Sequence, residues 1–321
     1  MITGSSGFIG SYLTNALIES GHNVIGIDKN AGNILHDNYH HIQGSILEKD
    51  LILSNLSGSI DYLIHLAAEH KDFGVSEEKY FRVNEHGTKV ILDCATEVGV
   101  EKIIFFSSVA VYGKIEKATE STAPSPSTLY GASKLAAENI IKSWIEDDSK
   151  RSAVIIRPAV VFGPENYANI YRLISRVCDG KFFWVGKGEN IKSVAYVENL
   201  VSATLFLLES MKIGIEIYNY SDEPPVSLKE LVNMVSQVAA VKLPDFHIPP
   251  KIAIYIGGII DVFGKLLRLN FSFTKERFQK FSTSSYYPSD KIRSAGFRQK
   301  IDLSEGISKT VDWYLESKAK Q

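Results

Sequence analysis

The chain has 321 residues, enough for a substantial core and, by length alone, about two domains. Apolar residues make up 45% and charged residues 22%, the usual proportions of a soluble globular protein. The formal net charge is −2, so the sequence has no basic footprint for DNA or RNA, and we expect no nucleic-acid partner.

The first half of the chain alternates short apolar runs with helical patterns. In chain order it predicts strands over 1–3, 23–27, 39–43, 61–66, 102–107 and 153–157, and helices over 11–20, 80–98 and 130–145. Strands that alternate with helices imply right-handed crossovers, so the predicted fold is α/β, a doubly wound parallel sheet of the Rossmann type. The first strand is unexpectedly short, because only Met1 and Ile2 precede Thr3.

After Gly163-Pro164 the pattern becomes less regular and richer in glycine- and proline-containing loops. We expect a smaller substrate-binding domain from residues 164–190 plus 221–321. Residues 191–220 are predicted to return to the main sheet, so that the dinucleotide-binding domain comprises 1–163 plus 191–220.

A glycine-rich turn follows the first strand, in the order Thr3-Gly4-Ser5-Ser6-Gly7-Phe8-Ile9-Gly10. In a strand-turn-helix context, Gly4 permits the tight turn, Gly7 the close approach of backbone to a pyrophosphate, and Gly10 the packing of helix on strand. The first helical N–H groups, around Phe8 and Ile9, then face the anion. The turn therefore predicts a dinucleotide site.

Asp28 ends the next predicted strand, 21 residues after Gly7. A carboxylate at this place hydrogen-bonds the adenosine ribose and repels a 2′-phosphate, so NAD(H) is expected and NADP(H) is disfavoured. Lys29 is adjacent and softens that preference.

Tyr130 and Lys134 lie four residues apart in a predicted helix, and so share one helix face. A neighbouring ammonium favours the phenolate and lowers the pKa of a tyrosine toward the range of a general base. Such a base can take the proton of a sugar or alcohol hydroxyl.

The sequence does not favour a metal site, secretion or a membrane-spanning segment. Cys94 and Cys178 fall in helical runs and are expected to be buried thiols, and no metal-binding spacing is present, so no metal is predicted. No secretory pattern begins the sequence, which favours the cytoplasm. The apolar run 252–263 is too short to span a bilayer, so membrane contact is not the expectation.

Taken together, these residues resemble the extended short-chain dehydrogenase/reductase family, the NAD-dependent sugar epimerase/dehydratase group. Further landmarks along the chain carry the resemblance: His65-Leu66-Ala67-Ala68, Asn84 with Gly87-Thr88, Ser107-Ser108 with Val111-Tyr112-Gly113, Arg157-Pro158, Phe162-Gly163-Pro164 and Tyr196-Val197. They cover nearly the whole chain.

The resemblance implies a catalytic triad of Ser108, Tyr130 and Lys134, in which the serine hydroxyl holds the reacting oxygen and the tyrosine exchanges the proton. It implies further cofactor contacts from Ser45, Ile46, Leu66, Ala67, Ala68, Asn84, Ser107, Pro158 and Val160, in addition to the glycine turn, Asp28, Tyr130 and Lys134. Substrate contacts are implied for His70, Ser108, Val109 and Lys192.

Departures from the family pattern bear on the reaction. Val109 and Ala110 stand where the sugar dehydratases carry an acidic pair, so 4,6-dehydration lacks its acid and base. Ser45 replaces an acidic residue near the adenine and leaves the backbone of Ile46 available. Val160 replaces an asparagine and Lys192 an arginine, which weakens the expected grip on a nucleotide diphosphate.

The leading hypothesis is an NAD(H)-dependent enzyme that acts on a carbinol or keto carbon of a nucleotide-linked sugar, as a 4-epimerase or a keto-sugar reductase. One alternative is a 3β-hydroxysteroid dehydrogenase-like enzyme, since residues 271–287 are similar to that branch. Another is a non-catalytic NAD-binding protein. The resemblance also implies a homodimer formed through helices 80–98 and 130–145.

Overall fold

The computed structural model describes residues 1–56, 58–71, 74–256, 258 and 283–320. The similarity to the steroid branch falls mostly on 271–282, outside the described residues, and so does much of the apolar run 252–263. Within that run, Ile252 and Tyr255 are exposed and Ala253 is buried.

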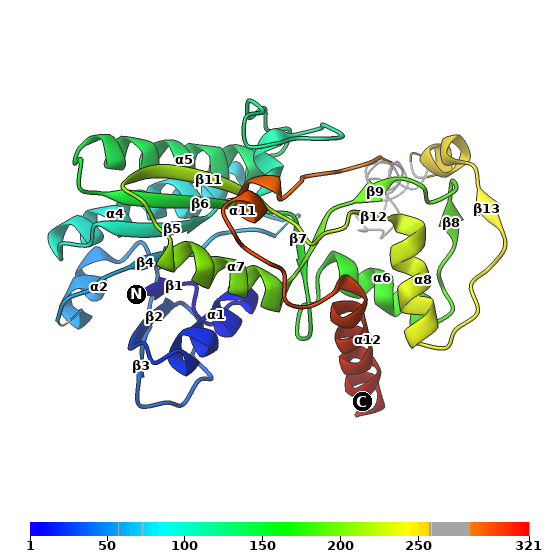
Figure 1. The fold of residues 1–321 in the computed structure, drawn as a ribbon, viewed down its shortest axis with the longest axis horizontal. Coiled ribbons are helices and arrows are strands. Elements are labelled where there is room, and N and C mark those ends of the chain that lie inside the picture. Colours follow the sequence, from blue (N-terminus) through cyan, green and yellow to red (C-terminus); the bar gives the residue numbers. More distant parts are fainter. Residues whose placement is uncertain (57, 72–73, 257, 259–282, 321) are drawn as a thin grey trace.

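Seven parallel strands form the central sheet, in the order β11-β6-β5-β4-β1-β2-β3 (Figure 1). Their bounds are β1 Ile2–Thr3, β2 Val24–Asp28, β3 Tyr39–Gln43, β4 Leu63–His65, β5 Lys102–Phe106, β6 Ser152–Pro158 and β11 Gly214–Tyr220. The predicted doubly wound parallel sheet is therefore confirmed, including the two-residue first strand. The strand order reverses between β1 and β4, which is where ligands bind in such sheets.

Helices cover both faces of this sheet (Figure 1). Helices α1 (Phe8–Glu19) and α7 (Val197–Glu209) lie on one face, and α2 (Lys49–Asn55), α4 (Gly87–Glu97) and α5 (Leu129–Glu146) lie on the other. Alternation along β5 separates the two cores: Ile104 packs with Leu13 of α1, whereas Ile103 packs with Ile141 of α5.

The predicted single helix 80–98 is wrong in one detail. Helix α3 (Glu77–Phe81) and helix α4 are joined by a π-helical turn, Arg82–His86. The helical period of the sequence continues through this turn, so only the tertiary contacts of Asn84, described below, reveal it.

A second lobe is built around helices α6 (Asn169–Cys178), α8 (Leu228–Val238) and α12 (Leu303–Ala319) (Figure 1). Ile174, Val232 and Ile307, one from each helix, are completely buried in its core. Three short strand pairs complete it or link it to the sheet: β7 (Val160–Phe162) with β10 (Val194–Tyr196), β8 (Trp184–Val185) with β13 (His247–Ile248), and β9 (Ile191–Lys192) with β12 (Val226–Ser227).

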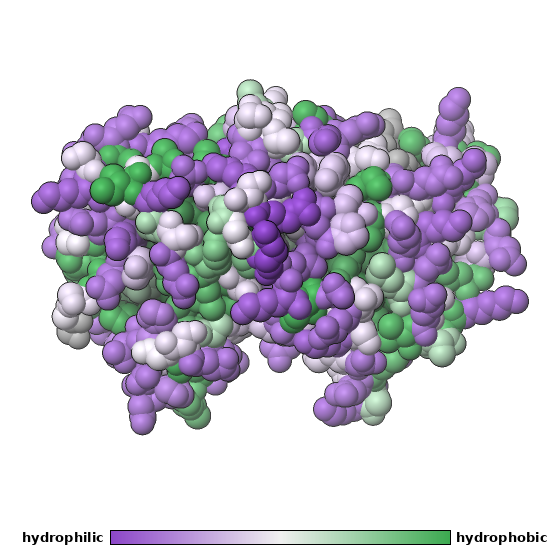
Figure 2. Space-filling view, in the orientation of Figure 1, coloured by the Kyte–Doolittle hydropathy of each residue, from purple (hydrophilic) through white to green (hydrophobic). Residues whose placement is uncertain are grey.

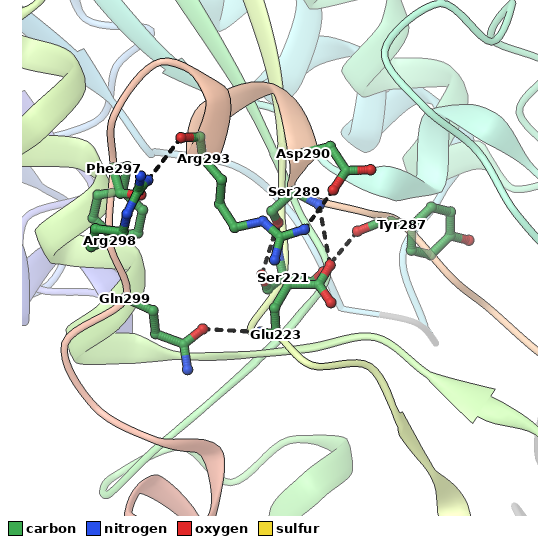
Figure 3. A network of polar contacts seen from close by, with 9 residues as sticks. All are labelled: Ser221, Glu223, Tyr287, Ser289, Asp290, Arg293, Phe297, Arg298 and Gln299. Atoms are coloured by element: carbon green, nitrogen blue, oxygen red, sulfur yellow. Dashed lines mark hydrogen bonds and ion pairs between the residues drawn. The ribbon is translucent and has the colours of Figure 1, made fainter.

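The segment that leads into α11 (Asp290–Ser294) is tied to the end of β11 by polar contacts (Figure 3). Ser289 Oγ accepts from the Ser221 N–H at 2.7 Å and donates to the Ser221 carbonyl at 2.8 Å. The Glu223 N–H donates to Gln299 Oε1 at 2.9 Å. These bonds fix the return of the chain to the sheet. The face of the molecule shown in Figure 2 carries mostly hydrophilic side chains.

Candidate active site

The glycine turn joins β1 to α1 with very little space. Gly4 has φ +75°, a left-handed conformation that favours glycine, and its N–H donates to the Ile27 carbonyl at 2.7 Å. A Cβ on Gly10 would lie 2.0 Å from the Gly4 carbonyl oxygen, a clash that excludes every residue other than glycine at this position. The expected helix–strand contact at Gly10 is therefore present.

Gly7 leaves the N-terminus of α1 open. It is the N-cap of the helix and is exposed, and it has no side chain that could satisfy the first helical N–H groups, which begin at Phe8 and Ile9. A Cβ on Gly7 would meet only the Gly4 carbonyl oxygen, at 3.2 Å. The backbone is thus free for close approach by an anion such as a pyrophosphate.

Asp28 ends β2 beside this turn. Its carboxylate accepts from the Ser6 N–H at 3.2 Å and from the Asn30 N–H at 2.9 Å, one on each oxygen. Two carboxylate oxygens offer about four acceptor positions, so capacity remains for ribose hydroxyls. The loop that carries Ser45 and Ile46 follows β3 next to it: Ile46 is buried, and Ser45 accepts from the Leu47 N–H at 3.2 Å.

The chain that leaves β4 lies against the same turn. The Leu66 N–H donates to the Thr3 carbonyl at 3.1 Å, and the Ala67 N–H donates to Thr3 Oγ1 at 3.3 Å. A Cβ on Gly4 would be 2.8 Å from the Ala67 nitrogen, so these two backbones touch. Ala67 and Ala68 remain half-buried, with small side chains beside the glycine turn.

His65 is a buried bracing residue for which the sequence reasoning assigned no role. Its Nδ1 is 2.6 Å from Thr3 Oγ1 and its Nε2 is 3.0 Å from Thr88 Oγ1. Burial, with the nearby Lys134 charge, lowers the pKa of His65 to about 3, so the ring is neutral at physiological pH. The signal in the sequence was a polar residue in an otherwise apolar strand.

Asn84, predicted to line the cofactor, makes three side-chain hydrogen bonds within the protein. Its amide is buried, accepts from the Glu69 N–H at 2.7 Å, and donates to the Glu69 carbonyl at 3.0 Å and to Ser133 Oγ at 2.9 Å. The side chain therefore connects the loop after β4, the π-helical turn and helix α5. These bonds fix the relative positions of the three segments; the cofactor contact of Asn84 stays a prediction.

The three predicted catalytic residues come from two neighbouring elements. Ser108 is the N-cap of the 3₁₀ turn Val109–Tyr112, and its Oγ accepts from the Ala110 N–H at 3.1 Å. Helix α5 docks on this turn, because a Cβ on Gly131 would lie 2.4 Å from the Ala110 carbonyl oxygen. Gly131 follows Tyr130 directly, so the close packing brings the tyrosine's turn of helix against the segment of Ser108.

Tyr130 is half-buried and its ring lies 6.4 Å, centroid to centroid, from that of Tyr80. Lys134, one turn later, is only 2% exposed, and its Nζ stands 4.2 Å from the centre of the Phe105 ring. Burial lowers the pKa of Lys134 to about 7, against the opposing effect of Glu138. The lysine thus changes charge near neutrality.

A buried polar network lies behind the triad, and sequence reasoning gave its members no such role. Glu138 accepts from Ser107 Oγ at 2.5 Å and pairs with Arg157 through two bonds, of 2.9 and 2.6 Å. Arg157 also donates to Tyr112 Oη at 2.9 Å, and that hydroxyl donates to Asn219 Oδ1 at 2.7 Å. Ser107, predicted to contact the cofactor, donates its hydroxyl to Glu138.

The remaining predicted residues lie at the ends of the sheet and of the strand pairs. Pro158 is buried at the end of β6, whereas Val160 on β7 is 39% exposed. Lys192 on β9 donates from Nζ to the Thr283 carbonyl at 2.7 Å, and burial lowers its pKa to about 8. Val109 is half-buried in the 3₁₀ turn, and His70 is exposed beyond β4.

The described residues show neither a metal-binding cluster nor a membrane-spanning helix. They contain no group of three or more His, Cys, Asp or Glu side chains arranged to hold a metal ion. Among the described helices, none combines the length and the apolar character needed to cross a membrane.

The glycine turn, the carboxylate at the end of β2 and the reversal of strand order define a dinucleotide-binding α/β protein of the doubly wound class. Residues 1–220 match the family model described as NAD dependent epimerase/dehydratase family. The chain belongs to this family.

Relatives of known activity match over nearly the full length. The chain is 33% identical over 317 residues to N-acetyl-alpha-D-glucosaminyl-diphospho-ditrans,octacis-undecaprenol 4-epimerase of Escherichia coli O157:H7, covering 98% of this chain and 94% of that protein. It is 29% identical to human dTDP-D-glucose 4,6-dehydratase, covering 99% and 90%. The structure of UDP-glucose 4-epimerase from Thermotoga maritima, solved with UDP-glucose, matches with a TM-score of 0.77 at 23% identity, over 98% of both chains, and supports the fold.

Proposed function

We propose that this protein is an NAD-dependent 4-epimerase of a sugar carried on a diphosphate. The observation that supports the proposal is the docking of α5 on the 3₁₀ turn that Ser108 caps, at Gly131 and Ala110, because Tyr130 belongs to the same first turn of α5. The identity to a 4-epimerase, at 33% over nearly the whole of both chains, favours epimerisation over simple reduction.

The residues at the glycine turn fit a bound dinucleotide. The open N-terminus of α1 at Gly7 would take the pyrophosphate, and Asp28 would take the adenosine ribose. The carboxylate favours NAD over NADP because it repels a 2′-phosphate. Bound NAD would supply a hydride acceptor and, once reduced, a hydride donor.

The protein groups would handle the proton. The Tyr130 phenolate would accept the proton of the sugar 4-hydroxyl while C4 is oxidised to the ketone, and would return it to the same oxygen while C4 is reduced from the opposite face. Ser108 Oγ donates a hydrogen bond to the same oxygen. Lys134, as an ammonium, would favour the phenolate. The family resemblance assigns it the nicotinamide ribose as a second partner.

Dehydration is the less favoured reaction despite the similarity to a dehydratase. Val109 and Ala110 follow Ser108 and offer no acid or base for loss of the 6-hydroxyl. A keto-sugar reductase remains the second candidate, since it would use the same three side chains and differ in releasing its cofactor after each turnover.

Two carriers fit the shared sugar-diphosphate chemistry. A nucleotide carrier follows from the resemblance of the chain to nucleotide-sugar enzymes, and a polyprenyl carrier is favoured by the name of the E. coli relative. Lys192 is the candidate cation for the diphosphate, because it is partly buried on β9, which pairs with β12, and retains its charge below its pKa of about 8.

The test incubates purified protein and NAD with UDP-N-acetylglucosamine and, separately, with N-acetylglucosaminyl diphosphoryl polyprenol in detergent. Chromatography of the released sugars reports epimerisation, and absorbance at 340 nm reports net NADH. Epimer formation without net NADH supports the epimerase, whereas net formation of NADH without an epimer supports the reductase, running in its oxidising direction. Turnover of a hydroxysteroid with no action on either sugar would overturn the proposal, and so would full activity of Tyr130→Phe.

We also propose that the chain forms a homodimer through the helical surfaces of residues 77–97 and 129–146. The packing of α4 beside α5 on one face of the sheet supports this, because it presents two parallel helical ridges to a second copy. A monomer mass by light scattering at micromolar concentration would contradict it.

A further inference from the structure

Glu138 occupies an unusual position for a carboxylate. It lies on α5 one turn after Lys134 and two turns after Tyr130, on the same face of the helix, and its side chain is completely buried. Burial of a charge is costly unless it is paired and hydrogen-bonded, so a fully buried carboxylate behind an active-site lysine calls for a physical reason.

The contacts of Glu138 point in two directions. Toward the triad, it accepts from Ser107 Oγ at 2.5 Å, and Ser107 precedes Ser108. Away from the triad, it is held by two bonds from Arg157, at 2.9 and 2.6 Å. Arg157 is in turn bonded to Tyr112, at the end of the 3₁₀ turn that Ser108 caps. Both ends of the Ser108 segment are therefore anchored to one ion pair.

Among the described residues, charged and titratable groups near Lys134 come from three elements. On its own helix they are Tyr130 and Glu138, on β4 there is His65, and on β6 there is Arg157, behind Glu138. His65 is neutral and Arg157 is positive, while Tyr130 must itself become an anion during the reaction. Glu138 is thus the standing negative charge within this set.

We propose that Glu138 is a positioning residue for the reaction: it fixes the Ser107-Ser108 segment and supplies the negative charge that keeps Lys134 an ammonium in a buried site. This inference rests on the proposed function for its kinetic consequence, but its electrostatic part concerns the protein alone. The opposing effect of Glu138 on the depressed pKa of Lys134 agrees with it.

The direct test is a titration of Lys134 in the protein without substrate. Lysine labelled with ¹³C at Cε is followed by NMR from pH 5 to 10, and the Lys134 signal is assigned by its loss in Lys134→Met. In Glu138→Gln the Lys134 midpoint should fall by about one pH unit, because an opposite charge within reach shifts a pKa by roughly that amount or more. An unchanged midpoint overturns the charge role, whether or not the protein proves to be an epimerase.

Kinetics separate the two parts of the role. Glu138→Gln keeps an oxygen that can accept from Ser107 but removes the negative charge. Because of the lost charge, kcat should fall by about tenfold or more, while KM should change by less than about threefold. The alkaline limb of the pH profile should move to lower pH, because Lys134 loses its proton at lower pH. Ser107→Ala removes only the hydrogen bond, so kcat should fall while the Lys134 midpoint stays in place. Unchanged kcat in both variants overturns the positioning role.

Glu138→Gln leaves Arg157 as a buried, unpaired charge, which can prevent folding. The double variant Glu138→Gln/Arg157→Met removes both charges and serves as the second measurement. The Lys134 midpoint should still fall in it, because Glu138 is the nearer of the two charges. A wild-type midpoint in the double variant would overturn the inference.

Discussion

The buried ammonium of Lys134 should lower the free energy of unfolding relative to a variant with an uncharged side chain at this position. Its pKa of about 7, against an ordinary value of 10.5, means that the folded state disfavours the protonated form. One pKa unit corresponds to about 1.4 kcal/mol, so the depression represents on the order of 4–5 kcal/mol below pH 7.

The sign of the pH dependence follows from proton binding. Between the folded pKa of about 7 and the unfolded value of 10.5, the unfolded chain holds more protons at this site than the folded chain. The destabilisation is therefore complete below pH 7 and is relieved as pH rises toward 10.5. Lys134→Met removes the titrating group and keeps an unbranched side chain against Phe105.

Lys134→Met should thus be more stable than wild type at pH 6, by about 2 kcal/mol or more, and this advantage should shrink by about 2–3 kcal/mol by pH 9. Urea unfolding of cofactor-free protein at pH 6, 7.5 and 9 measures it through the shift in midpoint. Lys142→Met is the matched control, on the same helix but partly exposed, and should change stability by less than about 0.5 kcal/mol at every pH. Equal or lower stability of Lys134→Met at pH 6, with no trend in pH, would refute the reasoning.

Three further changes probe other parts of the structure. Gly10→Ala should prevent folding, because its Cβ would lie 2.0 Å from the Gly4 carbonyl oxygen. Gly7→Ala should fold normally by circular dichroism but bind NAD about tenfold more weakly in calorimetry, and normal NAD binding by this variant would contradict the pyrophosphate assignment. Burial raises the pKa of Asp222 to about 7 from 3.8, so the folded protein keeps a proton that the unfolded chain loses, and the free energy of unfolding should fall as pH rises from 4 to 7. Asp222→Asn should flatten this pH dependence in urea unfolding, and an unaltered pH dependence would contradict the prediction. Asp28→Asn should narrow the preference for NAD over NADP by about tenfold in paired binding titrations, and an unaltered ratio would remove Asp28 from cofactor selection.

The sequence by itself determined the sheet and most of its strands. Strand-like runs of three to six residues between helical patterns identify the parallel strands. The glycine turn is recognised from its place between a strand and a helix, and the contact of Gly10 with Gly4 is a local steric need. The four-residue spacing of Tyr130 and Lys134 likewise fixes a shared helix face without reference to the rest of the chain.

Only the tertiary structure decided what surrounds those residues. The π-helical turn exists because Asn84 bonds to Glu69 and Ser133, residues 15 and 49 positions away, and no local pattern marks such contacts. The pairing of Glu138 with Arg157 joins a helix to a strand across 19 residues, and the depressed pKa of Lys134 arises from burial that a sequence does not display. Local sterics and periodicity depend on neighbouring residues and can be recognised in the sequence, whereas burial and long-range pairing arise only in the folded state. Burial and the charge of Glu138 together determine the protonation of Lys134, on which the proposed chemistry depends.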